Sequence, residues 1–139
     1  MTNRSALPAV PEKRTQAPLD IKTMRETSLR LLGPDAQLPT WEELETLILT
    51  LRGMIMLAIP EVEILAQRLS REDIPRYCAL ACIGDARQRL DLVQGHGLPA
   101  GIAHARKLSR ALNALCDHHV ALSNPALPTL PGKPTQEAS

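Results

Sequence analysis

Apolar residues recur every three or four positions through the middle of the chain, which is the spacing of an amphipathic α-helix. The clearest stripe runs from Leu98 through His119 to Leu122, and its members are Leu98, Ile102, Ala105, Leu108, Leu112, Leu115, His119 and Leu122. A second stripe comprises Leu44, Leu47, Ile48, Leu51, Ile55 and Ala58. Two weaker stretches begin near Asp20 and between Ser70 and Pro75. The pattern predicts an all-α fold, an antiparallel bundle of about four helices.

Local signals indicate where these helices begin and end. Asp20 is a good N-cap, and Thr40 followed by Glu43 reads as a capping box. Gly33 precedes a proline and suits the left-handed position after a helix, so the first helix should end there. The joins between helices are short, which predicts that sequential helices are antiparallel neighbours.

Two features of the predicted helices are less regular. Pro60 lies inside the second helical stretch, where it can either kink the helix or restart it, and the sequence leaves both open. In the third helix the stripe predicted to face the core comprises Ile74, Cys78, Ala81, Cys82, Ala86, Leu90 and Val93.

Proline is concentrated at both ends of the chain. Residues 1–19 hold three prolines and residues 124–139 hold four, at a spacing that supports neither a helix nor a sheet ladder. We therefore predict disordered tails over 1–19 and 124–139, and a single helical bundle domain over 20–123.

One run of apolar residues exceeds what a single helix face can bury. Met54 to Ile59 is six residues long, which is more than one full helical turn. Either this stretch passes through the middle of the bundle or a second subunit covers its outer side. Gly53 and Gly84 within helices favour a close helix approach, inside the fold or across a dimer. The residues predicted to form an interface are Gly53, Met54, Met56, Leu57 and Ile59.

Composition and charge exclude several classes of partner. The net charge is +1, and the nearest approach to a basic face is a group best read as a solvated surface, Arg87, Arg89, Arg106, Lys107 and Arg110. No nucleic-acid partner is indicated.

The most apolar segment, Leu47 to Ile59, is too short for a membrane span and contains Arg52. Three cysteines and no secretion signal predict a reduced, cytoplasmic protein.

Candidate chemistry centres on the cysteines. In an antiparallel pair of helices Cys78 and Cys82 lie opposite Cys116 and His119, and these four groups could form a tetrahedral zinc site. The alternative is that the thiols are ordinary core residues, since free cysteine is among the most buried residue types. No Glu-x-x-His pair occurs, which excludes a four-helix di-iron site. No catalytic signature is present, so the sequence favours a protein that is not an enzyme.

From Glu42 to His118 the chain resembles a family of small actinobacterial proteins of unknown function that are labelled natural product biosynthesis proteins. The residues that carry this resemblance are Trp41–Leu47, Arg52–Gly53, Ile59–Glu63, Gly84–Arg87 and Asn113–His118. The resemblance implies a cytoplasmic bacterial protein connected with secondary metabolism or its regulation. It implies no reaction and no catalytic residues.

These observations leave three hypotheses for the function. The first is a non-enzymatic helical module that binds a protein partner or a second copy of itself as a homodimer. The second is a metal-dependent or thiol-dependent protein that uses Cys78, Cys82, Cys116 and His119, with zinc as its cofactor. The third is a small-molecule binder with an apolar pocket between helices.

Overall fold

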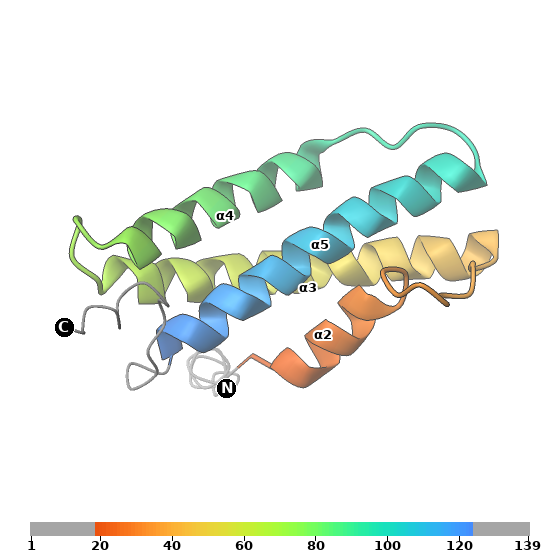
Figure 1. Cartoon of the computed structure of the whole chain (residues 1–139). Coiled ribbons are helices and arrows are strands. Elements are labelled where there is room, and N and C mark those ends of the chain that lie inside the picture. The colour runs from red at the N-terminus through yellow and green to blue at the C-terminus, as the bar shows by residue number, and fades with distance from the viewer. Residues whose placement is uncertain (1–18, 124–139) are drawn as a thin grey trace, which may run out of the picture.

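A computed structural model describes residues 19–123, and four α-helices make up most of that range. They are α2 (Ile21–Leu29), α3 (Trp41–Gln67), α4 (Ile74–Asp91) and α5 (Leu98–Ser123). No β-strand occurs in residues 19–123, so the prediction of an all-α bundle is confirmed. Successive helices run in alternate directions (Figure 1). The predicted disordered tails lie outside the described residues, except for Leu19.

The helices begin where the capping signals place them. The Thr40 hydroxyl accepts a hydrogen bond from the Glu43 amide at 3.2 Å, and the Glu43 carboxylate accepts one from the Thr40 amide at 2.9 Å. The Asp20 carboxylate accepts from the Thr23 amide at 3.1 Å. These bonds satisfy amides that have no partner within the first helical turn. The capping box and the N-cap predicted from the sequence are therefore confirmed.

The end of α2 differs from the prediction. The helix stops at Leu29, and tight turns follow, in which the Leu32 amide donates to the Leu29 carbonyl at 3.3 Å. Gly33 comes after these turns, so it is not the residue that terminates the helix. Among the described glycines only Gly97, just before α5, has a positive φ, of 90°. The expectation of a left-handed Gly33 was wrong.

Helix α3 continues unbroken through Pro60, which settles the choice between a continuous and a restarted helix. Pro60 has no backbone N–H group to donate, and its ring lies on the exposed side of α3. Residues on both sides of it, Ile59 and Val62, are buried in the core. Packing on the inner side thus holds the helix together across the missing hydrogen bond.

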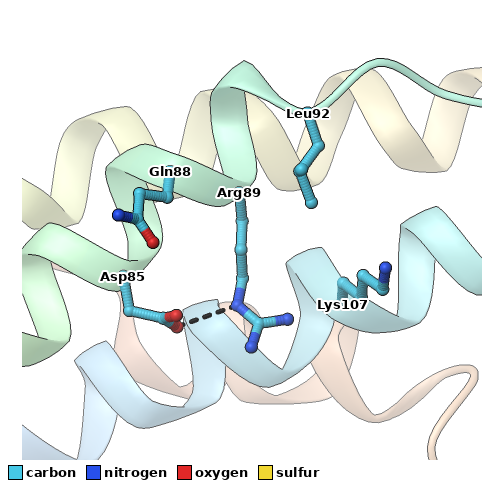
Figure 2. A pocket seen from close by; sticks show the side chains of 5 residues that line it. All are labelled: Asp85, Gln88, Arg89, Leu92 and Lys107. Atoms are coloured by element: carbon cyan, nitrogen blue, oxygen red, sulfur yellow. Dashed lines mark hydrogen bonds and ion pairs between the residues drawn. The ribbon is translucent and has the colours of Figure 1, made fainter.

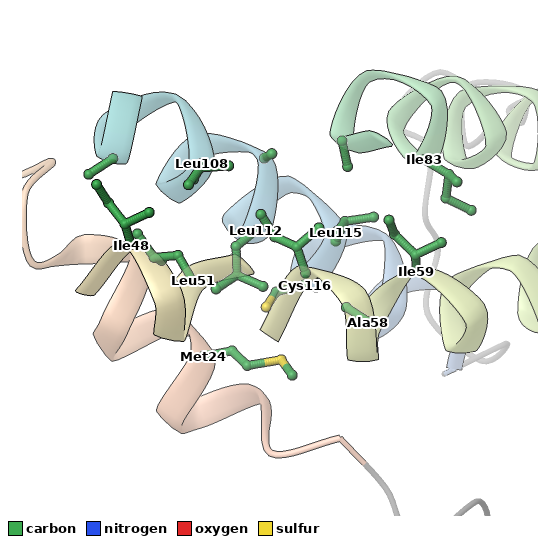
Figure 3. Close-up of a cluster of buried hydrophobic side chains, with 14 of the residues drawn as sticks. Met24, Ile48, Leu51, Ala58, Ile59, Ile83, Leu108, Leu112, Leu115 and Cys116 are labelled. Atoms are coloured by element: carbon green, nitrogen blue, oxygen red, sulfur yellow. The ribbon is translucent and has the colours of Figure 1, made fainter. Parts of the chain in front are cut away.

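The core forms mainly between α3 and α5, which lie along each other, with contributions from α2 and α4 (Figure 3). Fully enclosed side chains include Leu51 and Val62 of α3 and Leu108 and Leu112 of α5. The predicted stripe of α5 is buried from Ile102 to Leu115, while Leu98, His119 and Leu122 at its ends are half-buried. This interior of Leu, Ile, Val, Met and Ala matches a chain that has almost no aromatic residues.

The stripe predicted for the third helix was only partly right. Of its members Ala86 is buried, and Cys82 and Leu90 pack half-buried against the core, but Ile74, Cys78, Ala81 and Val93 are exposed. The other buried residues of α4, Ala79 and Ile83, lie outside the predicted stripe. Apolar side chains are spread around α4, so its sequence offers more than one possible inner face. Its packing against α3 and α5 buries the side that carries Ala79, Ile83 and Ala86.

Helix α2 packs mainly against α5 and only lightly against α3, its neighbour in sequence. Long-range polar contacts hold this arrangement. The Arg106 side chain of α5 donates to the Leu31 carbonyl at 3.2 Å, and Arg25 of α2 donates to the Asn113 side chain of α5 at 2.9 Å. Helices α2 and α4 therefore flank the central pair of α3 and α5 (Figure 1).

Candidate functional site

Helix α3 carries a second apolar face on the side away from the core. We call it the outer α3 face, and its members follow one another mostly at steps of three or four residues: Leu49, Gly53, Met56, Leu57, Pro60 and Ile64. Such steps keep residues on one side of a helix with about 3.6 residues per turn. The exposed fractions are 70% for Leu49, 55% for Met56, 62% for Leu57 and 47% for Ile64.

The residues predicted to form an interface divide between two sides of α3. Met56 and Leu57 are exposed on the outer α3 face, and Gly53 is half-buried within it. Ile59 is only 6% exposed and belongs to the core, and half-buried Met54 packs against the core. A continuous apolar run cannot lie on one face of a helix, because successive residues turn by about 100°.

Sequence reasoning missed Leu49, Pro60 and Ile64. The signal was present, because these residues continue the steps of three and four on both sides of Met56. Together they form a second stripe on the side of the helix opposite the core stripe, and the uninterrupted run from Met54 to Ile59 contains only part of it.

The glycines test the expectation of close helix approach. Among the described residues outside its own helix, a Cβ placed on Gly53 or Gly84 would have no neighbour within 4 Å, so none of the other three described helices comes close to either residue. The expectation of close approach inside the fold was wrong for both. Tight packing occurs instead at Gly101 of α5, where an added Cβ would lie 2.6 Å from Leu44 Cδ2.

Charge is distributed unevenly along α3. Its beginning is acidic, with Glu42, Glu43 and Glu45 all exposed, whereas exposed Arg68 and Arg71 follow its last turn. The acidic groups lie near the positive end of the helix dipole, where they are stabilising. The outer α3 face therefore begins beside these acidic groups and ends near exposed Arg68, whereas Arg71 is followed by exposed Glu72 and Asp73.

The four proposed metal ligands differ widely in exposure. Cys78 is exposed, Cys82 and His119 are half-buried, and Cys116 is buried. Within residues 19–123 no three His, Cys, Asp or Glu side chains form a group that could hold a metal ion. Burial, with smaller contributions from Asp85 and Asp117, raises the pKa of Cys82 to about 11. Burial also raises the pKa of Cys116. Both thiols are therefore protonated at neutral pH, which makes them poor ligands and poor nucleophiles.

A shallow pocket of about 230 Å³ lies between α4 and α5 (Figure 2). It is lined by four polar residues and one apolar residue: Asp85, Gln88, Arg89, Lys107 and Leu92. Arg89 Nε lies 2.8 Å from Asp85 Oδ2, so two of the charged groups already pair with each other. Ligand sites in proteins are usually larger and more apolar. This pocket is therefore a weak candidate for a small-molecule site.

The basic residues of α4 and α5 do not form a free cationic surface. Arg87 lies 3.6 Å from the Glu63 carboxylate, and Arg89 pairs with Asp85. Arg106 donates to the Leu31 carbonyl. Three of the five basic groups singled out in the sequence thus have partners within the fold, in keeping with a solvated helix surface.

The fold and its surface define a class of protein, an all-α bundle with an exposed apolar face on its longest helix. A family model described as a family of unknown function (DUF6415) matches residues 22–124, which is most of the chain. The protein belongs to this family. Comparison with curated proteins and with solved structures gave no match.

In the described part of the chain, none of the helices combines the length and the apolar character needed to cross a membrane.

Proposed function

We propose that this protein is a non-enzymatic helical interaction module that binds a protein surface through the outer α3 face. The observation that supports this proposal is the row of four large apolar side chains exposed along α3, Leu49, Met56, Leu57 and Ile64, on the side opposite the core. Met and Leu are common in the apolar centres of helix-binding surfaces, where they pack against a partner.

An exposed row of this kind favours association. Complete burial of a fully exposed large apolar side chain contributes roughly 1.5–3 kcal/mol, so each of these half-exposed side chains contributes about half of that when a partner covers it. Single exposed apolar residues are common on protein surfaces, but a contiguous patch usually marks an interaction site. Leu49, Met56, Leu57 and Ile64 extend over several turns of one helix, so a helix or a flat surface could contact them all at once.

The resemblance extends the proposal to a cellular role. We place the module in the cytoplasm of an actinobacterium, in secondary metabolism or its regulation. There it would act by contact with another polypeptide and not by catalysis. Two features of the candidate sites support a role without catalysis. In the pocket between α4 and α5 the charges of Asp85 and Arg89 pair with each other, and the thiols of Cys82 and Cys116 are protonated.

The proposal is tested by a pull-down from a lysate of the native host. The tagged protein captures its partners, which mass spectrometry identifies. The same experiment is then done with Met56→Lys and with Val93→Lys. Val93 is 93% exposed and lies outside α3, so its substitution controls for adding a charge to the surface. We expect Val93→Lys to retain the same polypeptides as wild type and Met56→Lys to lose them. Equal retention by both variants would contradict the proposal, as would a co-purifying metabolite with no polypeptide.

A further inference from the structure

We propose that the occupant of the outer α3 face is the same face of a second copy, packed antiparallel, with a two-fold axis passing between Met56 and Leu57. This inference rests on the proposed function, because it names the partner of the same surface. It goes further by fixing the direction and the register of the contact, and each can be tested separately.

The first argument is the symmetry of the residues on this face. Leu49 and Ile64 are equally far from the midpoint between Met56 and Leu57, and so are Gly53 and Pro60. An antiparallel pair related by a two-fold axis brings residues at equal distances from the axis to the same level. Leu49 would then meet Ile64 of the second copy, and Gly53 would meet its Pro60. The large side chains of Leu49 and Ile64 thus lie at one level, and the small Gly53 lies at the level of the compact ring of Pro60.

The second argument is the space at Gly53. Within residues 19–123, and apart from its own helix, no atom lies within 4 Å of a Cβ placed there. Both Gly53 and Pro60 are unfavourable inside a helix, by about 1 and 3 kcal/mol relative to Ala. Placed at one level of a helix pair, they remove bulk from the contact, so the two α3 helices can approach closely. Met56 and Leu57 of one copy then pack against Met56 and Leu57 of the other at the two-fold axis.

The third argument is charge. An antiparallel pair places the acidic beginning of each α3 against Arg68 at the end of the other. Glu45 lies level with Arg68 of the second copy, because the two residues are symmetric about the same midpoint. A parallel pair would instead place the exposed glutamates at the beginning of one α3 against those of the other, which is repulsive. The charges therefore favour the antiparallel direction.

Engineered disulfides test the direction and the register. All variants carry Cys78→Ser, because Cys78 is exposed and would cross-link on its own. Met56→Cys lies beside the axis, so mild oxidation should give a covalent dimer. Leu49→Cys should not cross-link to itself, because two such residues lie about 22 Å apart in the antiparallel pair. A mixture of Leu49→Cys and Ile64→Cys should form the mixed dimer.

These cross-links exclude the other arrangement. In a parallel pair Leu49→Cys would cross-link to itself, and the mixed dimer with Ile64→Cys would not form. That result would overturn the antiparallel direction. The parent chain carrying only Cys78→Ser is the control, and its half-buried Cys82 and buried Cys116 should give no covalent dimer.

Sedimentation velocity on the full-length chain, at about 5–200 µM, measures the association itself. We expect a monomer–dimer equilibrium, with Met56→Lys weakening the dimer at least about tenfold. Val93→Lys should leave it unchanged. Arg68→Glu, which reverses the charge that faces Glu45, should weaken it by up to about fivefold. A strict monomer over this range, or a dimer that Met56→Lys leaves intact, would overturn the inference.

The same data separate this inference from the proposed function. If the chain is monomeric but Met56→Lys still loses polypeptides that Val93→Lys retains, the outer α3 face binds another protein, and only the self-association is wrong. If the chain is monomeric and both variants retain the same polypeptides as wild type, both proposals fail.

Discussion

Gly101 of α5 lies directly against Leu44 of α3, so closely that a Cβ at position 101 would be 2.6 Å from Leu44 Cδ2. Leu44 is completely buried and has little room to move. We predict that Gly101→Ala lowers the free energy of unfolding by about 1–3 kcal/mol, because overpacking outweighs the gain in helix propensity. Urea denaturation followed by circular dichroism measures the change.

Gly84 provides the matched control for Gly101. It also lies inside a helix, but a Cβ placed on it meets no other part of the described chain within 4 Å. Gly84→Ala should therefore raise the free energy of unfolding, by about 1 kcal/mol, through helix propensity alone. If both substitutions changed stability in the same direction, the close contact between Gly101 and Leu44 would not be the cause.

Arg25 joins α2 to α5 through two polar contacts. Its guanidinium lies 2.8 Å from Asp117 Oδ1 and donates to Asn113 Oδ1 at 2.9 Å. We predict that Arg25→Met, which keeps most of the alkyl chain, lowers the free energy of unfolding by about 1–2 kcal/mol.

The control for Arg25 is Lys22→Met, on the same helix. Lys22 faces Glu26 at 4.0 Å within α2, and both side chains are largely exposed. Exposed ion pairs contribute little to stability, so Lys22→Met should change the free energy of unfolding by no more than about 0.5 kcal/mol. Hydrogen exchange of the α2 amides gives a second measurement, since Arg25→Met should speed it more than Lys22→Met does. Equal effects of the two variants would show that Arg25 does not anchor α2.

His104 makes stability depend on pH. Burial, and then the nearby charges of Arg52 and Lys107, lower the pKa of this almost completely buried side chain from 6.5. The unfolded chain therefore binds a proton more readily than the folded one in the range just below pH 6.5. The stabilising contribution of neutral His104 is complete above pH 6.5, and it is lost as the pH falls from there towards the lowered pKa.

Urea denaturation at several pH values between 7.5 and 5 measures this effect. His118 and His119 also have pKa values lowered mainly by burial, so part of the loss should remain in His104→Gln. We expect the free energy of unfolding of His104→Gln to fall less steeply with decreasing pH than that of wild type. Parallel curves would mean that His104 titrates in the fold as it does in the unfolded chain.

The three cysteines should differ in their reaction with iodoacetamide. Cys78 is exposed, whereas burial raises the pKa values of Cys82 and Cys116 and so keeps their thiolate fractions low. At pH 8 we expect the native protein to take up one label at Cys78 well before the others. In urea all three should react. Peptide mass spectrometry locates each label, and early modification of Cys82 in the native protein would contradict the prediction.

The sequence by itself determined the helices and most of their boundaries. Caps at Asp20 and Thr40 and the stripe from Ile102 to Leu115 act locally, through side chains within a few residues of one another, so they can be read without knowing the fold. The apolar excess around Met56 was also visible, because six consecutive apolar residues cannot all lie on one side of a helix.

Only the tertiary structure decided which faces turn inward. Helix α4 has apolar residues on several sides, and only its packing against α3 and α5 shows that Ala79, Ile83 and Ala86 form its inner face. Helix α3 has two apolar stripes, and α5 packs against the one that holds Leu51 and Val62, leaving Met56 and its neighbours exposed. Helical periodicity is a property of each segment alone, whereas burial depends on the shapes of the helices that pack together. The sequence could therefore indicate that α3 has apolar residues in excess, but only the packed bundle showed which of them remain exposed.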